Sequence, residues 1–150
     1  MHRPHLLLVA SVTALCVPVV GAAASDAGLR TTLNTWSKKI GVDAHSVSLA
    51  AQRRHPRRMT YSANRFHRDA VRARIAIAAQ KPTSAKGRRA RRLALTAFAD
   101  YARAGTEWAV SGRSRLNHQR ATSIKSARAG ARDAAAGNRL LITAGKLLRS

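Results

Sequence analysis

Apolar residues recur every three or four positions along most of the chain, which is the spacing that one face of an α-helix requires. From residue 26 onward, four stretches show this spacing, and none shows the strict alternation of a β-strand. A residue before proline and a Ser-Gly pair both predict a break in a helix, and they occur at His55-Pro56, Lys81-Pro82 and Ser111-Gly112. The pattern therefore predicts helices over residues 26–54, 59–80, 84–110 and 114–148.

Each predicted helix has an apolar stripe that indicates how it packs. The first three stripes run through Leu29, Phe66 and Phe98, and a second strip of Val71, Ile75 and Ala78 predicts two neighbours for the second helix. The inner side expected for the fourth helix is Leu116, Ala121, Ile124, Ala127, Ala131, Ala135, Asn138, Leu141, Ile142 and Gly145. Four amphipathic helices with short connections predict an all-α, small antiparallel bundle. The alternative is a three-helix arrangement with one loose segment.

Several single residues refine this expectation. Ser25 or Asp26, Thr83 or Ser84, and Ser114 are the expected N-caps. Gly41 lies on no packing position, whereas Gly130 and Gly137 are typical of close helix contacts. Every aromatic residue from Trp36 onward lies on an apolar stripe except Tyr61. Asn138 is expected to be a buried hydrogen-bonding residue.

The start of the chain has a different pattern. Arg3 precedes an apolar run over residues 6–20, and Ala22 and Ala24 then form a small-x-small arrangement. These are the three parts of a secretory signal peptide, so we expect residues 1–24 to be removed and residues 25–150 to form one domain. An uncleaved anchor is the alternative. Cys16 lies inside this run, so the mature domain would contain no cysteine and no transmembrane span.

Charge is the strongest chemical feature. The chain carries 28 Lys and Arg against six Asp and Glu, a net charge of +22. Clusters of basic residues occur at residues 53–58, at residues 88–92 and along one face of the fourth predicted helix. The candidate anion-binding residues are Arg53, Arg54, Arg57, Arg58, Arg88, Arg89, Arg92, Lys125, Arg128, Arg132, Arg139 and Lys146. Four arginines at a helix start oppose the helix dipole, which favours a bound anion or a nearby acid.

A catalytic constellation is not visible. Asp100, Arg103 and Glu107 have the spacing of surface ion pairs on one helix side, and a paired-carboxylate hydrolytic site is the minor alternative. The histidines lack helical metal-site spacing, and no phosphate-binding glycine loop is present. We therefore expect no enzyme activity, no metal and no cofactor.

These observations lead to one main hypothesis. It is an exported protein, secreted or associated with the cell envelope, that binds a polyanion such as a wall polymer, anionic lipid or nucleic acid. The alternative is a structural or protein-interaction module, either oligomeric or with an acidic protein partner, whose charge confers only solubility. The sequence leaves the ligand and the oligomeric state open.

Overall fold

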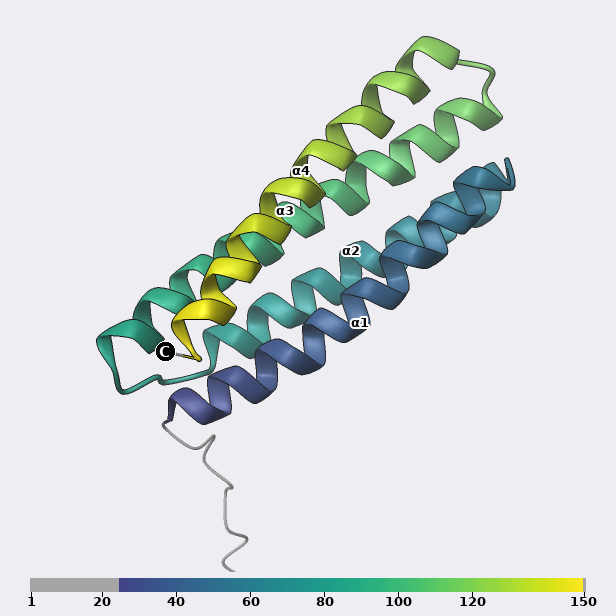
Figure 1. Cartoon of the computed structure of the whole chain (residues 1–150). Helices are drawn as coiled ribbons and strands as arrows, with labels where there is room; N and C mark the ends of the chain where they lie inside the picture. The colour runs from purple at the N-terminus through teal and green to yellow at the C-terminus, as the bar shows by residue number, and fades with distance from the viewer. Residues whose placement is uncertain (1–24, 150) are drawn as a thin grey trace, which may run out of the picture.

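The computed structural model describes residues 25–149, and every regular element in that range is an α-helix. The helices are α1 (Asp26–Gln52), α2 (Pro56–Ala78), α3 (Ala85–Leu116) and α4 (Arg120–Leu147). They run up, down, up and down, so both the α1–α2 and α3–α4 turns lie at one end (Figure 1). The predicted all-α antiparallel bundle of four helices is confirmed.

Residues 1–24 lie outside the described part of the chain, and the prediction of a signal peptide falls on them. Across the residues that are described, none of the helices combines the length and the apolar character needed to cross a membrane.

Two of the helix starts are capped as expected. The Ser25 hydroxyl accepts a hydrogen bond from the Gly28 amide at 3.0 Å, and the Ser84 hydroxyl accepts one from the Gly87 amide at 2.8 Å. Proline at the first position of α2 has no amide hydrogen to leave unpaired, so it suits a helix start.

The core is built from aromatic and large aliphatic side chains at its centre. Leu29, Phe66, Ile77 and Phe98 are its largest fully buried side chains. The ring centroids of Phe66 and Tyr101 lie 5.9 Å apart and those of Phe98 and Tyr101 5.8 Å, within the range of favourable aromatic pairs. Tyr61 is 64% exposed, as its position off the stripe predicted.

The predicted break at Ser111-Gly112 is wrong. Helix α3 continues through both residues to Leu116, and Ser114 is buried inside it rather than capping α4. Gly112 is needed for close packing, because a Cβ there would lie 2.3 Å from the Thr60 hydroxyl oxygen of α2. The Ser111 hydroxyl donates a hydrogen bond to the Ser123 carbonyl at 2.9 Å, which ties α3 to α4.

The inner face predicted for α4 is also wrong in most of its positions. Ala121, Ile124, Ala131, Ala135, Asn138 and Ile142 are exposed. Helix α4 instead packs on α3 through Ser123, Ser126, Gly130, Gly137 and Ala144. The reason is close approach: a Cβ on Gly130 would lie 2.7 Å from the Trp108 ring, and one on Gly137 would lie 2.8 Å from the Ala97 carbonyl oxygen.

Consecutive helices pack against each other, so α2 lies between α1 and α3 as predicted. Its second apolar strip does not make those contacts, because Val71, Ile75 and Ala78 are exposed. The buried face of α2 comprises the residues around Phe66, Ala70 and Ala73, which α1 and α3 share.

Asp26 joins the first turn of α1 to the start of α3. Its carboxylate accepts hydrogen bonds from the Thr83 amide at 3.0 Å, the Ser84 amide at 3.3 Å and the Ser84 hydroxyl. The hydrogen bond from the Ser84 hydroxyl is the main cause that holds the pKa of Asp26 below its usual value, and Arg88 adds to it. The basic start of α3 is therefore placed beside an acid.

Candidate anion-binding surface

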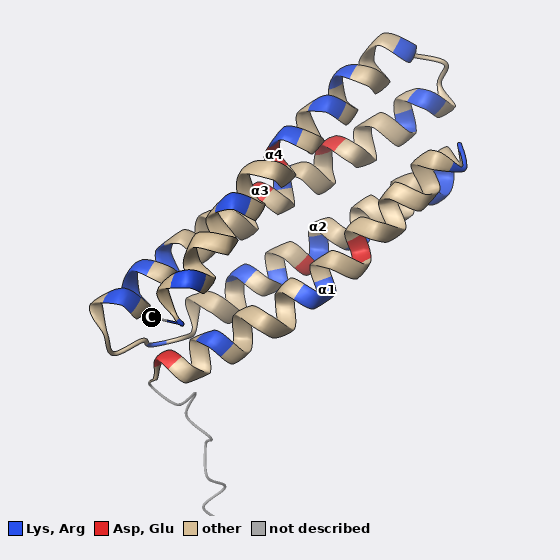
Figure 2. Ribbon diagram, viewed as in Figure 1, with Lys and Arg blue, Asp and Glu red and all other residues tan. Residues whose placement is uncertain are grey.

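Charge is segregated along the length of the bundle. Residues 44–68 and 108–132 contain twelve Lys and Arg and no Asp or Glu. Because the two turns lie at one end, these segments form a single half of the molecule, which we call the basic half (Figure 2). All six acidic residues lie in the other half.

Three of the acidic side chains in the other half are buried in the bundle and pair with basic side chains. Asp43, Asp69 and Asp100 are each 5% exposed or less. Asp69 pairs with Lys39 at 3.3 Å and with Arg72 at 3.5 Å. Of the twelve cations in the basic half, Arg65 alone has an acidic partner within the described chain, which is Asp43 at 2.7 Å.

The expected surface ion pairs of Asp100 need correction. Asp100 is buried, and it pairs with Arg103, whose side chain is 63% exposed. Arg103 also lies 4.0 Å from Asp133, while Glu107 makes no ion pair in the part of the chain that is described. The Asp100 carboxylate is thus an internal anchor for a surface arginine.

The two turns of the basic half have the same backbone conformation. Arg54 and His118 occupy equivalent left-handed positions, with φ of 55° and 57°. The next residues, His55 and Gln119, are N-caps that offer no side-chain hydrogen bond to the helix they begin. A left-handed conformation costs a residue with a Cβ about 1 kcal/mol or more relative to glycine. Both turns therefore carry a basic side chain or histidine at a position that glycine would stabilise.

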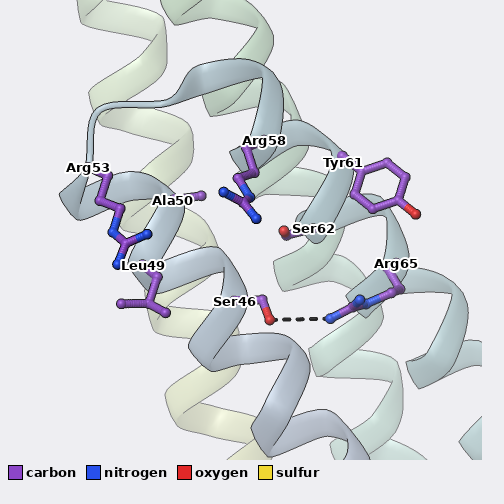
Figure 3. Close-up of a pocket in the computed structure, with 8 residues that line it drawn as sticks. All are labelled: Ser46, Leu49, Ala50, Arg53, Arg58, Tyr61, Ser62 and Arg65. Atoms are coloured by element: carbon purple, nitrogen blue, oxygen red, sulfur yellow. Dashed lines mark hydrogen bonds between the residues drawn. The ribbon is translucent and has the colours of Figure 1, made fainter.

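A pocket of about 210 Å³ lies between α1 and α2 beside the first turn (Figure 3). Arg53, Arg58 and Arg65 line it, and Arg58 extends into the space between the helices. Arg65 is held in place by Asp43 and by a 3.2 Å hydrogen bond to the Ser46 hydroxyl. Arg53 and Arg58 have no such partner among residues 25–149, so their guanidinium groups are free to bind an anion.

A second depression, of about 590 Å³, joins the two turns. It is lined by Arg54 from the first turn and by Arg115, His118 and Arg120 from the second. Arg57 and Arg58 line a neighbouring depression with Leu116. Guanidinium groups from two hairpins are thus brought to one surface.

All the candidate anion-binding residues predicted from sequence are exposed, but the structure places some of them in the basic half and the others in the other half of the molecule. Arg53, Arg54, Arg57 and Arg58 lie at the turns, and Lys125, Arg128 and Arg132 continue the basic half along α4, where they line a shallow depression of about 350 Å³. Five candidates belong to the other half: Arg88, Arg89, Arg92, Arg139 and Lys146.

Sequence reasoning missed Arg115, His118 and Arg120. They were placed near a helix start inside the fourth predicted helix, whereas they surround the α3–α4 turn. The two long acid-free segments were a signal that could have identified this half of the molecule.

Asn138, expected to be buried, is exposed beside the space between α1 and α4. Among residues 25–149, no group of three or more histidine and acidic side chains is placed to hold a metal ion. Compared with protein families, with functionally curated proteins and with solved structures, the chain shows no significant match.

Proposed function

We propose that the protein is exported and binds a linear polyanion, such as a phosphate-bearing wall polymer or a nucleic acid, through its basic half. One observation carries this proposal: eleven of the twelve cations in the basic half have no acidic partner within the described residues, and no acid lies among them. Phosphate contacts by such cations release counterions, which supplies affinity without sequence recognition.

An extended polymer suits this surface better than a small anion. Between Arg120 and Arg132, α4 rises by about 18 Å. Both turns add cations at the beginning of that stretch. Tyr61 is the exposed aromatic side chain of the basic half. A base-stacking surface would need several exposed aromatics, so we expect binding that tolerates any sequence.

Export is part of the same proposal, and it rests on the signal-like pattern of residues 1–24. We propose a binding role without catalysis, because Asp43, Asp69 and Asp100 are committed to ion pairs and most of the cations in the basic half are free of acidic partners among the described residues. N-terminal sequencing of the extracellular protein tests export, and a first residue of Met1 in that fraction would contradict cleavage.

The binding test is salt-dependent retention on heparin and on double-stranded DNA. We expect a quadruple variant, Arg53→Gln, Arg54→Gln, Arg57→Gln and Arg58→Gln, to lower the slope of log K against log salt by about 3 to 4. The matched control changes Arg74, Lys86, Arg89 and Arg92 to glutamine. It removes the same charge from the other half, at side chains for which no hydrogen bond or ion pair occurs in the described structure.

A smaller change in slope for the control supports a localised surface. Equal changes in the two variants would show that net charge alone attracts the polymer, and they would overturn the proposal. Elution of the unaltered protein at low salt would overturn it as well.

A further inference from the structure

A groove of about 400 Å³ runs between α1 and α4, the two outer helices of the bundle. Gly41 and Ala44 of α1 form one wall, and Ala135 and Leu141 of α4 form part of the other. The groove stays open because these walls are mostly small: nothing lies within 4 Å of where a Cβ on Gly41 would be. Its volume is in the range of sites that bind small molecules.

The floor of the groove is an aromatic cluster. Phe66, Tyr101 and Trp108 line it from α2 and α3, and the Phe66 and Trp108 ring centroids lie 5.2 Å apart. Phe66 is 1% exposed, so the floor rests directly on the core. An apolar floor between two helices favours a hydrocarbon chain or another apolar body.

The floor of the groove contains one hydroxyl group, that of Tyr101. Tyr101 is 6% exposed, and its hydroxyl makes no hydrogen bond within the described residues. Burial, helped by the nearby Asp100 carboxylate, raises the pKa of Tyr101 to about 12, so the hydroxyl keeps its proton. The Tyr101 hydroxyl is not among the fully buried, unpartnered side-chain atoms of the described residues, so it remains accessible as a donor for a ligand with an uncharged acceptor such as an ester carbonyl.

The outer edge of the groove is cationic. Among the described residues, no Asp or Glu lines the groove. Asn138 and Leu141 of α4 line the groove. The residue after each of them, Arg139 and the exposed Ile142, lies about 100° further around the helix axis, away from the groove. Arg132 and Lys146 lie on the same side of α4 as Arg139. The apolar groove is therefore bordered on α4 by an apolar edge, and a row of cations lies beyond that edge.

We propose that the α1–α4 groove binds a single-chain anionic phospholipid. Its acyl chain lies over Phe66 and Trp108, its ester carbonyl accepts a hydrogen bond from the Tyr101 hydroxyl, and its phosphate meets the cationic row of α4. The site shares Arg132 with the edge of the basic half, but its other polar groups, Tyr101, Arg139 and Lys146, lie outside that half. The proposal therefore does not depend on the function proposed for the basic half.

The test uses the full chain and lysophosphatidylglycerol with a 16-carbon chain, below its micelle concentration (a single-chain lipid with an anionic head). Trp108 lines the groove, so its fluorescence reports binding. We expect Tyr101→Phe to weaken binding about three- to ten-fold, because it removes one hydrogen bond and keeps the ring. Gly41→Leu fills the groove and should weaken binding by more than about ten-fold.

Val42→Leu is the matched control for Gly41→Leu, because Val42 is 64% exposed and does not line the groove. It should bind like the unaltered chain. If thermal melts show that Gly41→Leu does not fold, Tyr101→Phe and the choice of lipid decide the question.

Two further probes separate the parts of the ligand. Lysophosphatidylcholine, which has the same chain and no net charge, should bind more weakly, and glycerophosphoglycerol, which has no chain, should not change the fluorescence. Absence of lipid-induced fluorescence change, unchanged affinity in Tyr101→Phe and a folded Gly41→Leu, or equal affinity for the two lipids would each overturn the proposal. The quadruple arginine variant of the basic half should bind the lipid unchanged, which makes failure of this site distinguishable from failure of polyanion binding.

Discussion

Replacing Asp43 with asparagine should stabilise the protein at neutral pH. Asp43 is 3% exposed, and its Oδ1 accepts a 2.7 Å hydrogen bond from the Arg65 Nε. Its Oδ2 is buried and has no hydrogen-bond partner among the described residues. Burial, followed by the neighbouring Asp69 carboxyl, raises the pKa of Asp43 above its ordinary value of 3.8. An asparagine can keep an acceptor for Arg65 and offers the second position a donor.

Two opposing effects determine the magnitude. Relief of the buried, unpartnered oxygen and of the repulsion from Asp69 should stabilise the folded state by about 1–3 kcal/mol. Loss of the charged pair with Arg65 should cost about 0–1 kcal/mol, because the Arg65 side chain is 40% exposed and solvated. The net expectation is an increase of about 1 kcal/mol in the free energy of unfolding, or about 3 °C in Tm.

The effect should depend on pH with a definite sign. Because the native pKa of Asp43 is raised, the folded protein binds the proton more tightly than the unfolded chain does. The unaltered protein therefore loses stability as the pH rises from about 4 through the native pKa. The asparagine variant has no such loss, so its advantage should be small near pH 4 and should grow toward neutral pH.

Urea unfolding of Asp43→Asn followed by circular dichroism between pH 4 and pH 8 measures this difference. Asp133→Asn is the control, because Asp133 is only partly buried and lies 4.0 Å from Arg103. It should change stability by less than about 0.5 kcal/mol. A less stable Asp43→Asn variant at pH 7, or a difference that is the same at every pH, would refute the reasoning.

Four further predictions concern packing, a turn and the contact of Asp26 with the start of α3, and thermal or urea unfolding measures the change in stability for each. Gly105→Ala should lower the free energy of unfolding by about 2 kcal/mol or more, because its Cβ would lie 2.8 Å from an α2 backbone nitrogen. Gly41→Ala, with open space around its Cβ, should raise it by about 0.5–1 kcal/mol, and a loss there would contradict the open groove wall. Arg54→Gly should stabilise the α1–α2 turn by about 1 kcal/mol while weakening DNA retention, and unchanged retention would exclude Arg54 from the surface. Asp26→Asn should destabilise the protein at neutral pH and have little effect in acid. Since the native pKa of Asp26 is lowered, the unaltered protein loses the stabilisation from this group as the pH falls below about 4, and a penalty that persists in acid would contradict this.

Large apolar side chains allowed much of the fold to be predicted from the sequence. The predicted stripe through Leu29 is buried, and it continues through Leu33, Ile40 and Val47. Large apolar groups gain most from leaving water and so determine which side of α1 faces inward. The caps at Ser25 and Ser84 depend on local hydrogen bonds, which neighbouring residues provide.

In α4, alanine, glycine and serine do not show from the sequence which side of the helix faces inward. They occur on several sides of that helix and differ little in burial free energy, so the apolar pattern did not identify its packed face. The tertiary structure decided it through close approach, where Gly130 meets the Trp108 ring and Gly137 meets the Ala97 carbonyl. Close packing also accounts for Ser111 and Gly112, which lie within α3 instead of ending it, because Gly112 allows α3 to approach Thr60 of α2.

The sequence by itself determined the helical class, the basic character and the cluster at residues 53–58. Only the tertiary structure placed Arg115, His118 and Arg120 beside that cluster and buried Asp43 next to Asp69. The physical reason is that helix periodicity and charge are properties of neighbouring residues. The meeting of two turns, or of two carboxyls, depends instead on where each helix ends and how closely it approaches the next.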